Sequence, residues 1–243
     1  MPRIYNATIT ALALNPRRIT RTLAAIACVL ILLSLAGQIF KHVFGHDDVH
    51  GLVLLFYVDQ EHNIPSFFSA AQLLLAATLL ALIAALKAGT GGTFRYRWAG
   101  LALTFLYMSV DEAVGIHELL TGPTRTMLGL PDHGIFQFAW VIPGAMIAVA
   151  LGLWFLRLLL SLPPRTRRQF IVAAVLFVGG ALGFELLGGL YYRQGAETFG
   201  YSLLSTAEEG LEMAGIIVFI DALLQYVAGE YREILLRIEG GRS

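Results

Sequence analysis

The stretch that decides the fold is YSLLSTAEEGLEMAG, residues 201–215, inside a segment that is otherwise apolar enough to cross a membrane. At 100° per residue, its polar side chains fall on one narrow stripe of a helix. Ionisable groups at bilayer depth are costly and normally face a protein interior or a water-filled cavity. The stretch therefore predicts a helix whose polar face is turned towards its neighbours. The stripe consists of Tyr201, Ser205, Glu208, Glu212 and Gly215, with Glu209 at its edge.

The composition of the whole chain is that of a polytopic membrane protein. Of its 243 residues, 57% are hydrophobic and only 14% are charged, and the mean hydropathy is +0.69. The formal net charge is zero and no basic stripe follows the sequence, which argues against nucleic acid as a partner. The single cysteine, Cys28, lies in an apolar run, so the sequence offers no disulfide framework and no cysteine-based metal site.

Six segments approach or exceed the length needed to cross a hydrocarbon core, which is about 20 residues. Placing the N-terminus inside leaves only Lys41, Arg125 and Arg193 of the 17 basic residues on the outer side. This asymmetry fixes the orientation, because cytoplasmic loops carry the excess of Lys and Arg. We therefore predict an all-α bundle of six transmembrane helices, N-in and C-in, that forms one domain over residues 1–243 in the cytoplasmic (inner) membrane. The predicted spans are approximately 23–40, 64–87, 98–120, 135–161, 169–192 and 202–228.

The first outer loop, residues 41–63, has polar ends and an apolar middle, LVLLFYV. That middle is too short to span the bilayer, so it predicts a short interfacial segment. Asn63, followed by Ile64 and Pro65, predicts a helix N-cap with proline in the first turn.

Three histidines in the same loop follow a spacing of i, i+4 and i+8. If that part were helical, the imidazoles would share one face and could form a transition-metal or haem site. Solvated surface histidines are the simpler interpretation, because Gly45 weakens a helix there. The three are His42, His46 and His50.

Acidic side chains from three predicted spans share the outer half of the membrane, judged by depth along each helix. No Lys or Arg lies in the outer half of any span, so bound cations or protons are needed to hold the carboxylates together. Carboxylates with one or two histidines are a ligand set for iron, manganese or zinc. We therefore predict a divalent metal site, with His117 and Glu118 as further ligands or as catalytic acid–base groups. The predicted metal ligands are Asp111, Glu112, Glu185, Glu208, Glu209 and Glu212.

Two patterns predict how the helices pack. Small residues at Gly179 and Gly183 would allow close approach of the fifth span and bring Glu185 against the polar stripe. Asp221 and Arg157 lie at comparable inner depth, which predicts an ion pair between the sixth and fourth spans.

Three functions remain open from the sequence. The first is metal-dependent hydrolytic or oxidative chemistry on a lipid-like substrate, and the second is a small proton or cation transporter or channel. A broken helix would favour the transporter, and Pro143-Gly144 is the candidate break. The third is a non-catalytic subunit of a larger membrane complex. The expected partners are membrane lipid and possible further membrane subunits or copies of the chain. The Glu-x-x-His pairs of ferritin-like di-iron bundles do not occur.

Overall fold

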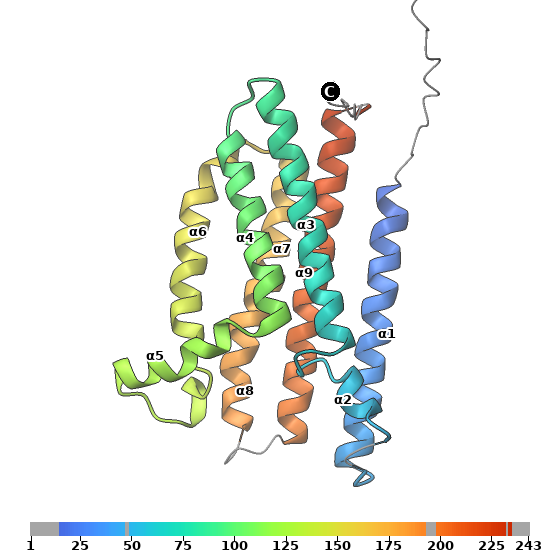
Figure 1. Cartoon of the computed structure of the whole chain (residues 1–243), viewed down its shortest axis with the longest axis vertical. Helices are drawn as coiled ribbons and strands as arrows, with labels where there is room; N and C mark the ends of the chain where they lie inside the picture. The colour runs from blue at the N-terminus through green and yellow to red at the C-terminus, as the bar shows by residue number, and fades with distance from the viewer. Residues whose placement is uncertain (1–14, 47–48, 193–197, 232, 235–243) are drawn as a thin grey trace, which may run out of the picture.

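The computed structural model describes residues 15–46, 49–192, 198–231 and 233–234, and in these residues every regular element is a helix. The long helices stand side by side in one bundle (Figure 1). They are α1 (Pro16–His42), α3 (Ile64–Gly89), α4 (Arg95–Val114), α6 (Val141–Ser161), α7 (Pro164–Val178) and α9 (Phe199–Glu230). The short helices are α2 (Leu52–Phe56), α5 (Thr121–Leu128) and α8 (Glu185–Tyr191), with the 3-10 turns η1 (His117–Leu120) and η2 (Gly134–Phe136).

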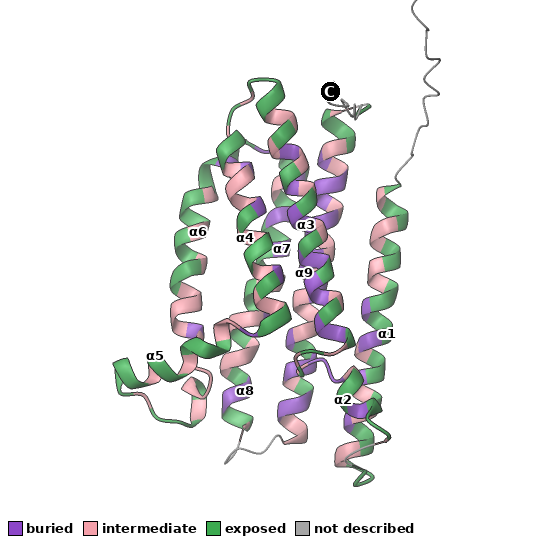
Figure 2. Ribbon diagram, viewed as in Figure 1, coloured by how far each residue is buried: buried purple, intermediate pink, exposed green. Residues whose placement is uncertain are grey.

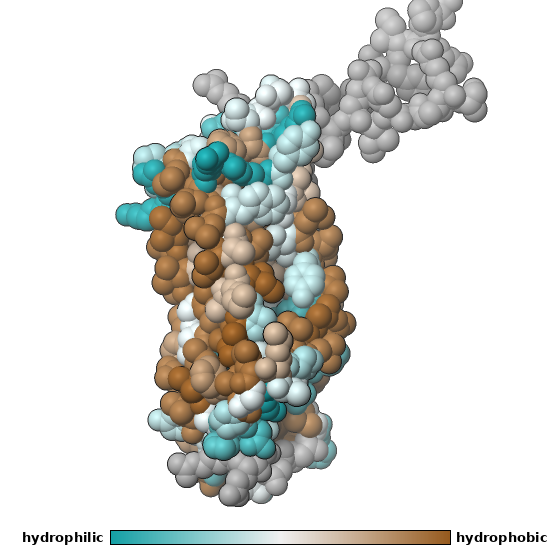
Figure 3. All heavy atoms as spheres, turned by 90° about the vertical axis from the view of Figure 1, so that its left-hand side faces the viewer, coloured by the Kyte–Doolittle hydropathy of each residue, from teal (hydrophilic) through white to brown (hydrophobic). Residues whose placement is uncertain are grey.

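Five helical runs are long and apolar enough to cross a membrane: α1, α3, α6, the continuous run Pro164–Tyr191, and α9. A sixth crossing exists only if α4 and the segment His117–Leu128 count as one span, although they are bent by 83° to each other. The surface supports the assignment to a membrane, because a broad hydrophobic band separates hydrophilic ends (Figure 3). The chain is therefore a multi-pass membrane protein.

The helix starts follow ordinary capping chemistry. Asn15 caps α1, and Thr198 caps α9. The predicted cap at Asn63 is confirmed: its side chain accepts a hydrogen bond from the Ser66 backbone N–H at 3.1 Å, and the Ser66 hydroxyl accepts one from the Asn63 N–H. Pro65 lies in the first turn of α3, also as predicted.

The third predicted span, 98–120, is too long at its outer end. Helix α4 ends at Val114, and Gly115 then adopts the left-handed conformation with φ +65°. Its N–H donates to the Asp111 carbonyl at 2.7 Å and closes the helix. The chain next turns sideways through η1 into α5, so Glu118 lies beyond the helix that carries Asp111.

The two ends of the bundle differ in charge. At one end, called here the basic end, lie the start of α1 and the α3–α4 and α6–α7 connections (Figure 1). The opposite end, called here the site end, carries α2, α5 and α8 (Figure 1). Arg193, one of the three predicted outer cations, lies outside the described residues. The basic end carries Arg17, Arg18, Arg21, Lys87, Arg95, Arg97, Arg165, Arg167 and Arg168.

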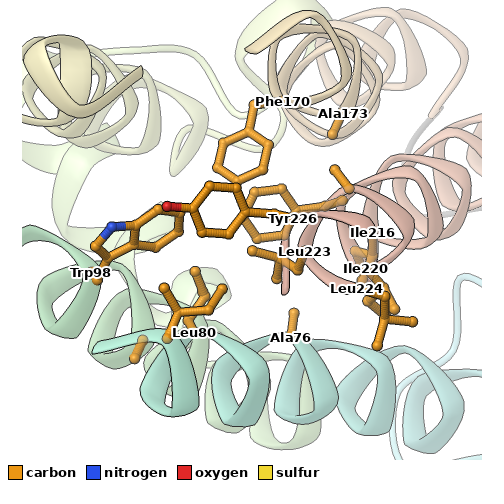
Figure 4. Close-up of a cluster of buried hydrophobic side chains, with 14 of the residues drawn as sticks. Ala76, Leu80, Trp98, Phe170, Ala173, Ile216, Ile220, Leu223, Leu224 and Tyr226 are labelled. Carbon is orange, nitrogen blue, oxygen red and sulfur yellow. The ribbon is translucent and has the colours of Figure 1, made fainter. Parts of the chain in front are cut away.

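The apolar core forms where α9 packs against α3, α4 and α7, towards the basic end (Figure 4). Trp98 of α4 is 1% exposed, and it stacks on Tyr226 at 5.3 Å and meets Phe170 edge-on at 6.3 Å. Buried residues are concentrated along α3 and α9, whereas α6 is largely exposed (Figure 2). Helix α9 is therefore the central helix of the bundle, and α6 presents its outer face to lipid.

The predicted ion pair between Asp221 and Arg157 is wrong. Asp221 accepts a hydrogen bond from Gln169 of α7 at 3.0 Å and a second, short one from Gln225. Helix α7 is the helix that packs along this part of α9, so it supplies the partner. Arg157 instead lines a pocket at the basic end.

Candidate functional site

His117 is held by Asp111 across the turn that ends α4. The Asp111 carboxylate accepts the His117 backbone N–H at 2.8 Å with one oxygen and contacts Nδ1 at 2.9 Å with the other. The tautomer with its proton on Nδ1 donates to Asp111 and leaves Nε2 as a free lone pair. A carboxylate behind a histidine in this way fixes the ring and raises its basicity as a metal ligand. The left-handed conformation of Gly115 makes the reversal possible.

Glu61 reaches the same place from the loop between α2 and α3. Its carboxylate lies directly against Gly115, so that a Cβ at this position would overlap it. Asn63 fixes the loop, because its amide donates to the carbonyls of Leu54 at 3.0 Å and Tyr57 at 2.6 Å. Burial, and then the nearby charge of Glu118, raise the pKa of Glu61 above its ordinary value.

Glu61, His117 and Glu118 form the tightest metal-ligand group in the described part of the chain. Each offers one ligand atom, and these atoms all lie within 4.8 Å of one another. Glu118 is exposed, while the other two are partly buried, so the group opens to the surface. Each ligand atom lies about 2.1 Å from a zinc ion, so two ligands of a tetrahedral site are about 3.4 Å apart. Small side-chain adjustments would close the group around a cation.

Trp140 connects this group to the carboxylates inside the bundle. Its ring lies 4.4 Å from that of His117, centre to centre, and its indole N–H donates to Glu185 at 2.9 Å. Glu185 is also close enough to Glu208 and Asp59 for their charges to interact. The site therefore continues from the surface ligands to the first residue of α8 and on to α9.

The carboxylates predicted from sequence do converge. On α9, Glu209 and Glu212 interact electrostatically with Glu112 of α4 and with Glu185 of α8. Glu208 is 8% exposed, whereas the other four are half-buried. The prediction that the polar stripe of α9 faces the interior is confirmed, because Tyr201, Ser205, Glu208 and Gly215 are buried and Glu212 is half-buried.

A π-helical segment, Gly179–Phe184, separates α7 from α8 and precedes Glu185 directly. Within it, Gly180 lies against α9: a Cβ there would be 2.9 Å from the Glu208 carbonyl oxygen and 3.0 Å from Glu212 Cγ. The prediction that Gly179 and Gly183 make this approach is wrong, since a Cβ at either meets nothing within 4 Å. Gly180 instead continues the face of α7 that meets α9, because Ala173 and Phe177 on that face lie against Gly215.

Three buried polar side chains at this level have no hydrogen-bond partner in the described structure. They are Gln38 of α1, which is fully buried, and Ser69 and Gln72 of α3, which are 3% and 1% exposed. Buried polar groups are normally satisfied, so these side chains need water or a ligand. The interior beside the carboxylates is therefore suited to holding water.

Two polar groups of the site were missed from the sequence, Glu61 and Asp59. Asp59 accepts a hydrogen bond from the Tyr201 hydroxyl at 3.1 Å and so joins the loop to α9. Both belong to the run YVDQEHN, which ends at the correctly predicted cap Asn63. The cap was the available signal for these two residues, because it places the run at the start of α3, which lies at the site end together with the end of α4.

The three loop histidines do not share a helical face. Helix α1 ends at His42, and His50 has a left-handed backbone with φ +53°. His42 Nε2 lies 3.3 Å from the Ser202 hydroxyl, and its ring packs beside Phe199. The i, i+4, i+8 arrangement is therefore wrong, because it required a continuous helix.

Residues 22–227 match the family model described as Domain of unknown function (DUF8692), so the chain belongs to this family. No curated protein and no solved structure matches the chain. The family description names no activity, and the function must be argued from the site itself.

Proposed function

We propose that this protein is a membrane enzyme that binds a divalent metal at Glu61, His117 and Glu118 and acts on a lipid-like substrate by hydrolytic or oxidative chemistry. The observation that supports this most strongly is the convergence of these three ligand atoms within 4.8 Å, with Asp111 orienting the histidine. One nitrogen and two carboxylate oxygens with an open position suit zinc, iron or manganese.

The proposed topology is six spans with both termini in the cytoplasm of an inner membrane, and α4 together with the bent segment His117–Leu128 counts as the third crossing. The distribution of basic residues supports it, because the basic end then faces the cytoplasm. The metal ligands would lie at the outer interface, where charged groups are close to water.

A lipid-like substrate is supported by the surface next to the ligands. Leu119, adjacent to Glu118, is 73% exposed, and Met127 and Leu128 of α5 are 86% and 50% exposed. Helix α5 projects sideways from the site end (Figure 1). An exposed apolar segment at this level would lie in the membrane interface, where a lipid headgroup reaches the ligands.

The residues divide the chemistry between them. A bound metal would act as a Lewis acid or as a redox centre. Asp111 holds the His117 ring, and Glu118, the exposed carboxylate, has a second oxygen that could accept a proton while the first binds the metal. Trp140 packs against His117 and donates to Glu185, so it links the ligands to the inner carboxylates.

Elemental analysis of protein purified in mild detergent, without chelator or a nickel column, tests the proposal. We expect near-stoichiometric zinc, iron or manganese in the wild type and its loss in His117→Ala and Glu61→Gln. His133→Ala is the matched control, because His133 also contacts an aspartate, Asp132, but is 79% exposed. A well-folded wild-type protein without metal, or equal metal loss in the control, contradicts the proposal.

A second candidate, a proton or cation pathway through the inner carboxylates, is favoured by one specific observation. The π-helical segment Gly179–Phe184 distorts a spanning run directly before Glu185, and such segments inside α-helices are frequent at functional sites. Pro143 does not break a helix, because it lies in the first turn of α6. Proteoliposomes with an internal pH dye test this candidate: proton uptake that Glu185→Gln abolishes would favour transport, and no uptake would exclude it.

A further inference from the structure

A pocket at the basic end, far along the bundle from the metal ligands, has no role in the proposed chemistry. It has a volume of about 480 Å³, within the range of about 300–1,000 Å³ typical of small-molecule sites. The α3–α4 connection and the first turn of α4 supply most of its lining, and α6 supplies one residue. The lining residues are Gly92, Phe94, Arg95, Tyr96, Arg97 and Arg157.

Three of these lining residues are arginines and none is acidic. Aromatic rings hold two of them: Arg95 lies over Tyr96 at 4.7 Å and donates to its hydroxyl at 2.8 Å, and Arg97 lies over Phe94 at 5.0 Å. Within the part of the chain that the structure describes, no carboxylate is paired with Arg95, Arg97 or Arg157. Stacking leaves guanidinium N–H donors that no described carboxylate occupies, and guanidinium groups bind phosphate strongly through such donors.

One donor in the pocket is already desolvated. Arg97 Nη1 is buried and has no hydrogen-bond partner among the described residues. A buried, unsatisfied charged donor is costly, so the position favours an acceptor that arrives from outside the chain. The backbone also favours an anion at this position. Phe94 has a left-handed conformation with φ +66°, and α4 starts directly after it. The N-terminal amides of α4 therefore lie at the pocket, where they favour an anion.

The surface next to the pocket is apolar. Gly100, one turn further along α4, lies against Trp154 and Phe155 of α6. Trp154 is 54% exposed, and Leu103 on the next turn of α4 is 66% exposed. On the face that carries α6, a hydrophobic surface starts immediately beneath the hydrophilic end (Figure 3). An anionic group in the pocket would therefore have its hydrocarbon chains beside α4 and α6.

We propose that this pocket binds the phosphate of an anionic phospholipid from the leaflet at the basic end. Arg97 and Arg157 bind the phosphate oxygens, the start of α4 adds backbone donors, and the acyl chains lie over Trp154. Anionic lipids are concentrated in cytoplasmic leaflets, and basic pockets between spans recognise their headgroups. A soluble phosphate ester carries the same anionic group but has no chains to use the apolar surface. The inference is independent of the metal site.

Native mass spectrometry in detergent, with added phosphatidylglycerol, phosphatidylcholine or inorganic phosphate, tests the proposal. We expect phosphatidylglycerol to bind the wild type more tightly than phosphatidylcholine. Arg97→Gln/Arg157→Gln should weaken that binding by about fivefold for each arginine replaced. Arg165→Gln/Arg168→Gln is the control, because these arginines are exposed at the same end but outside the pocket.

Two further arms keep the test decisive. If the glutamine variant does not fold, Arg97→Lys/Arg157→Lys keeps the charge, loses the planar fork, and should retain only part of the preference. Equal weakening in the control, or no weakening in either pocket variant, overturns the proposal. Inorganic phosphate that displaces phosphatidylglycerol at millimolar concentration overturns the lipid assignment in favour of a soluble phosphate ligand.

Discussion

Helix α9 passes through two environments. One is an apolar core that stabilises the fold, and the other is a cluster of carboxylates suited to chemistry. Towards the basic end, Ile220 and Leu223 are fully buried in a dry core around Trp98. Towards the site end, the same helix presents Glu208 and Glu212 to other carboxylates. A helix anchored in a dry core can hold repelling groups in place at its other end. The predictions below test this division.

The largest effect is expected in the dry half. Trp98→Ala removes a side chain that is 1% exposed and contacts both Phe170 and Tyr226. The free energy of unfolding should fall by about 3 kcal/mol, the lower end for tryptophan, because lipid already surrounds the unfolded spans. Thermal melts in detergent measure it, with Trp154→Ala as the lipid-exposed control. Equal losses in both variants would mean that the core is not where stability resides.

The second prediction tests the close contact between the π-helical segment and α9. Gly180→Ala places a methyl group 2.9 Å from the Glu208 carbonyl oxygen, and backbone cannot easily move away. We expect a loss of about 1–3 kcal/mol from overpacking. Gly179→Ala is the control one residue away, where a Cβ meets nothing within 4 Å, and it should be neutral or slightly stabilising. The same melts compare them, and a harmless Gly180→Ala would refute the close approach.

The third prediction is a gain in stability rather than a loss. Glu212→Gln removes one titratable carboxyl from a group in which Glu112 and Glu185 also lie nearby. Stability in the presence of a chelator should rise by about 1 kcal/mol, because mutual repulsion and desolvation are relieved. Glu230→Gln makes the same chemical change but breaks the 3.2 Å pair with Lys87, so stability should fall slightly, by up to about 1 kcal/mol. A large loss in Glu212→Gln would instead favour a purely structural role for the carboxylates.

The features that the sequence could predict are those set by local patterns along each helix. The helical bundle, the Asn63 cap and the inward stripe of α9 follow from local patterns of hydropathy and capping, so they were predictable. The convergence of Glu185 with the α9 carboxylates followed from depth along each helix. These features depend on the periodicity and length of each segment, and both can be read from one sequence.

The errors concern features that depend on the backbone between helices. Helix α4 stops early because Gly115 enters a left-handed conformation, and this moves Glu118 away from Asp111's helix and towards Glu61. Gly180, rather than Gly179, makes the helix contact because it continues the α7 face of Ala173 and Phe177, which lies against α9. Asp221 bonds to Gln169 because α7 lies beside α9. Depth along each helix does not reveal this order of helices around α9. Loop geometry and helix order were therefore the missing information.

The sharpest test of the metal centre comes from two glycines at which substitution should change stability only slightly. Gly115 and Gly129 both have left-handed backbones, with φ +65° and +64°, and each closes a helix. Alanine at either position should lower the free energy of unfolding by about 1 kcal/mol, because Cβ is strained there. The surroundings differ: a Cβ at Gly129 meets nothing within 4 Å, whereas one at Gly115 overlaps the Glu61 carboxylate.

The two variants therefore separate strain from site geometry. Gly115→Ala must displace Glu61 from His117 and Glu118, so metal affinity should fall by about tenfold or more, as when a supporting contact of a metal ligand is lost. Gly129→Ala should bind metal like the wild type despite an equal loss of stability. Competitive titration with a metal-sensitive dye measures both. Unchanged affinity in Gly115→Ala would remove Glu61 from the ligand set, and the metal centre would then have to lie among the inner carboxylates of α8 and α9.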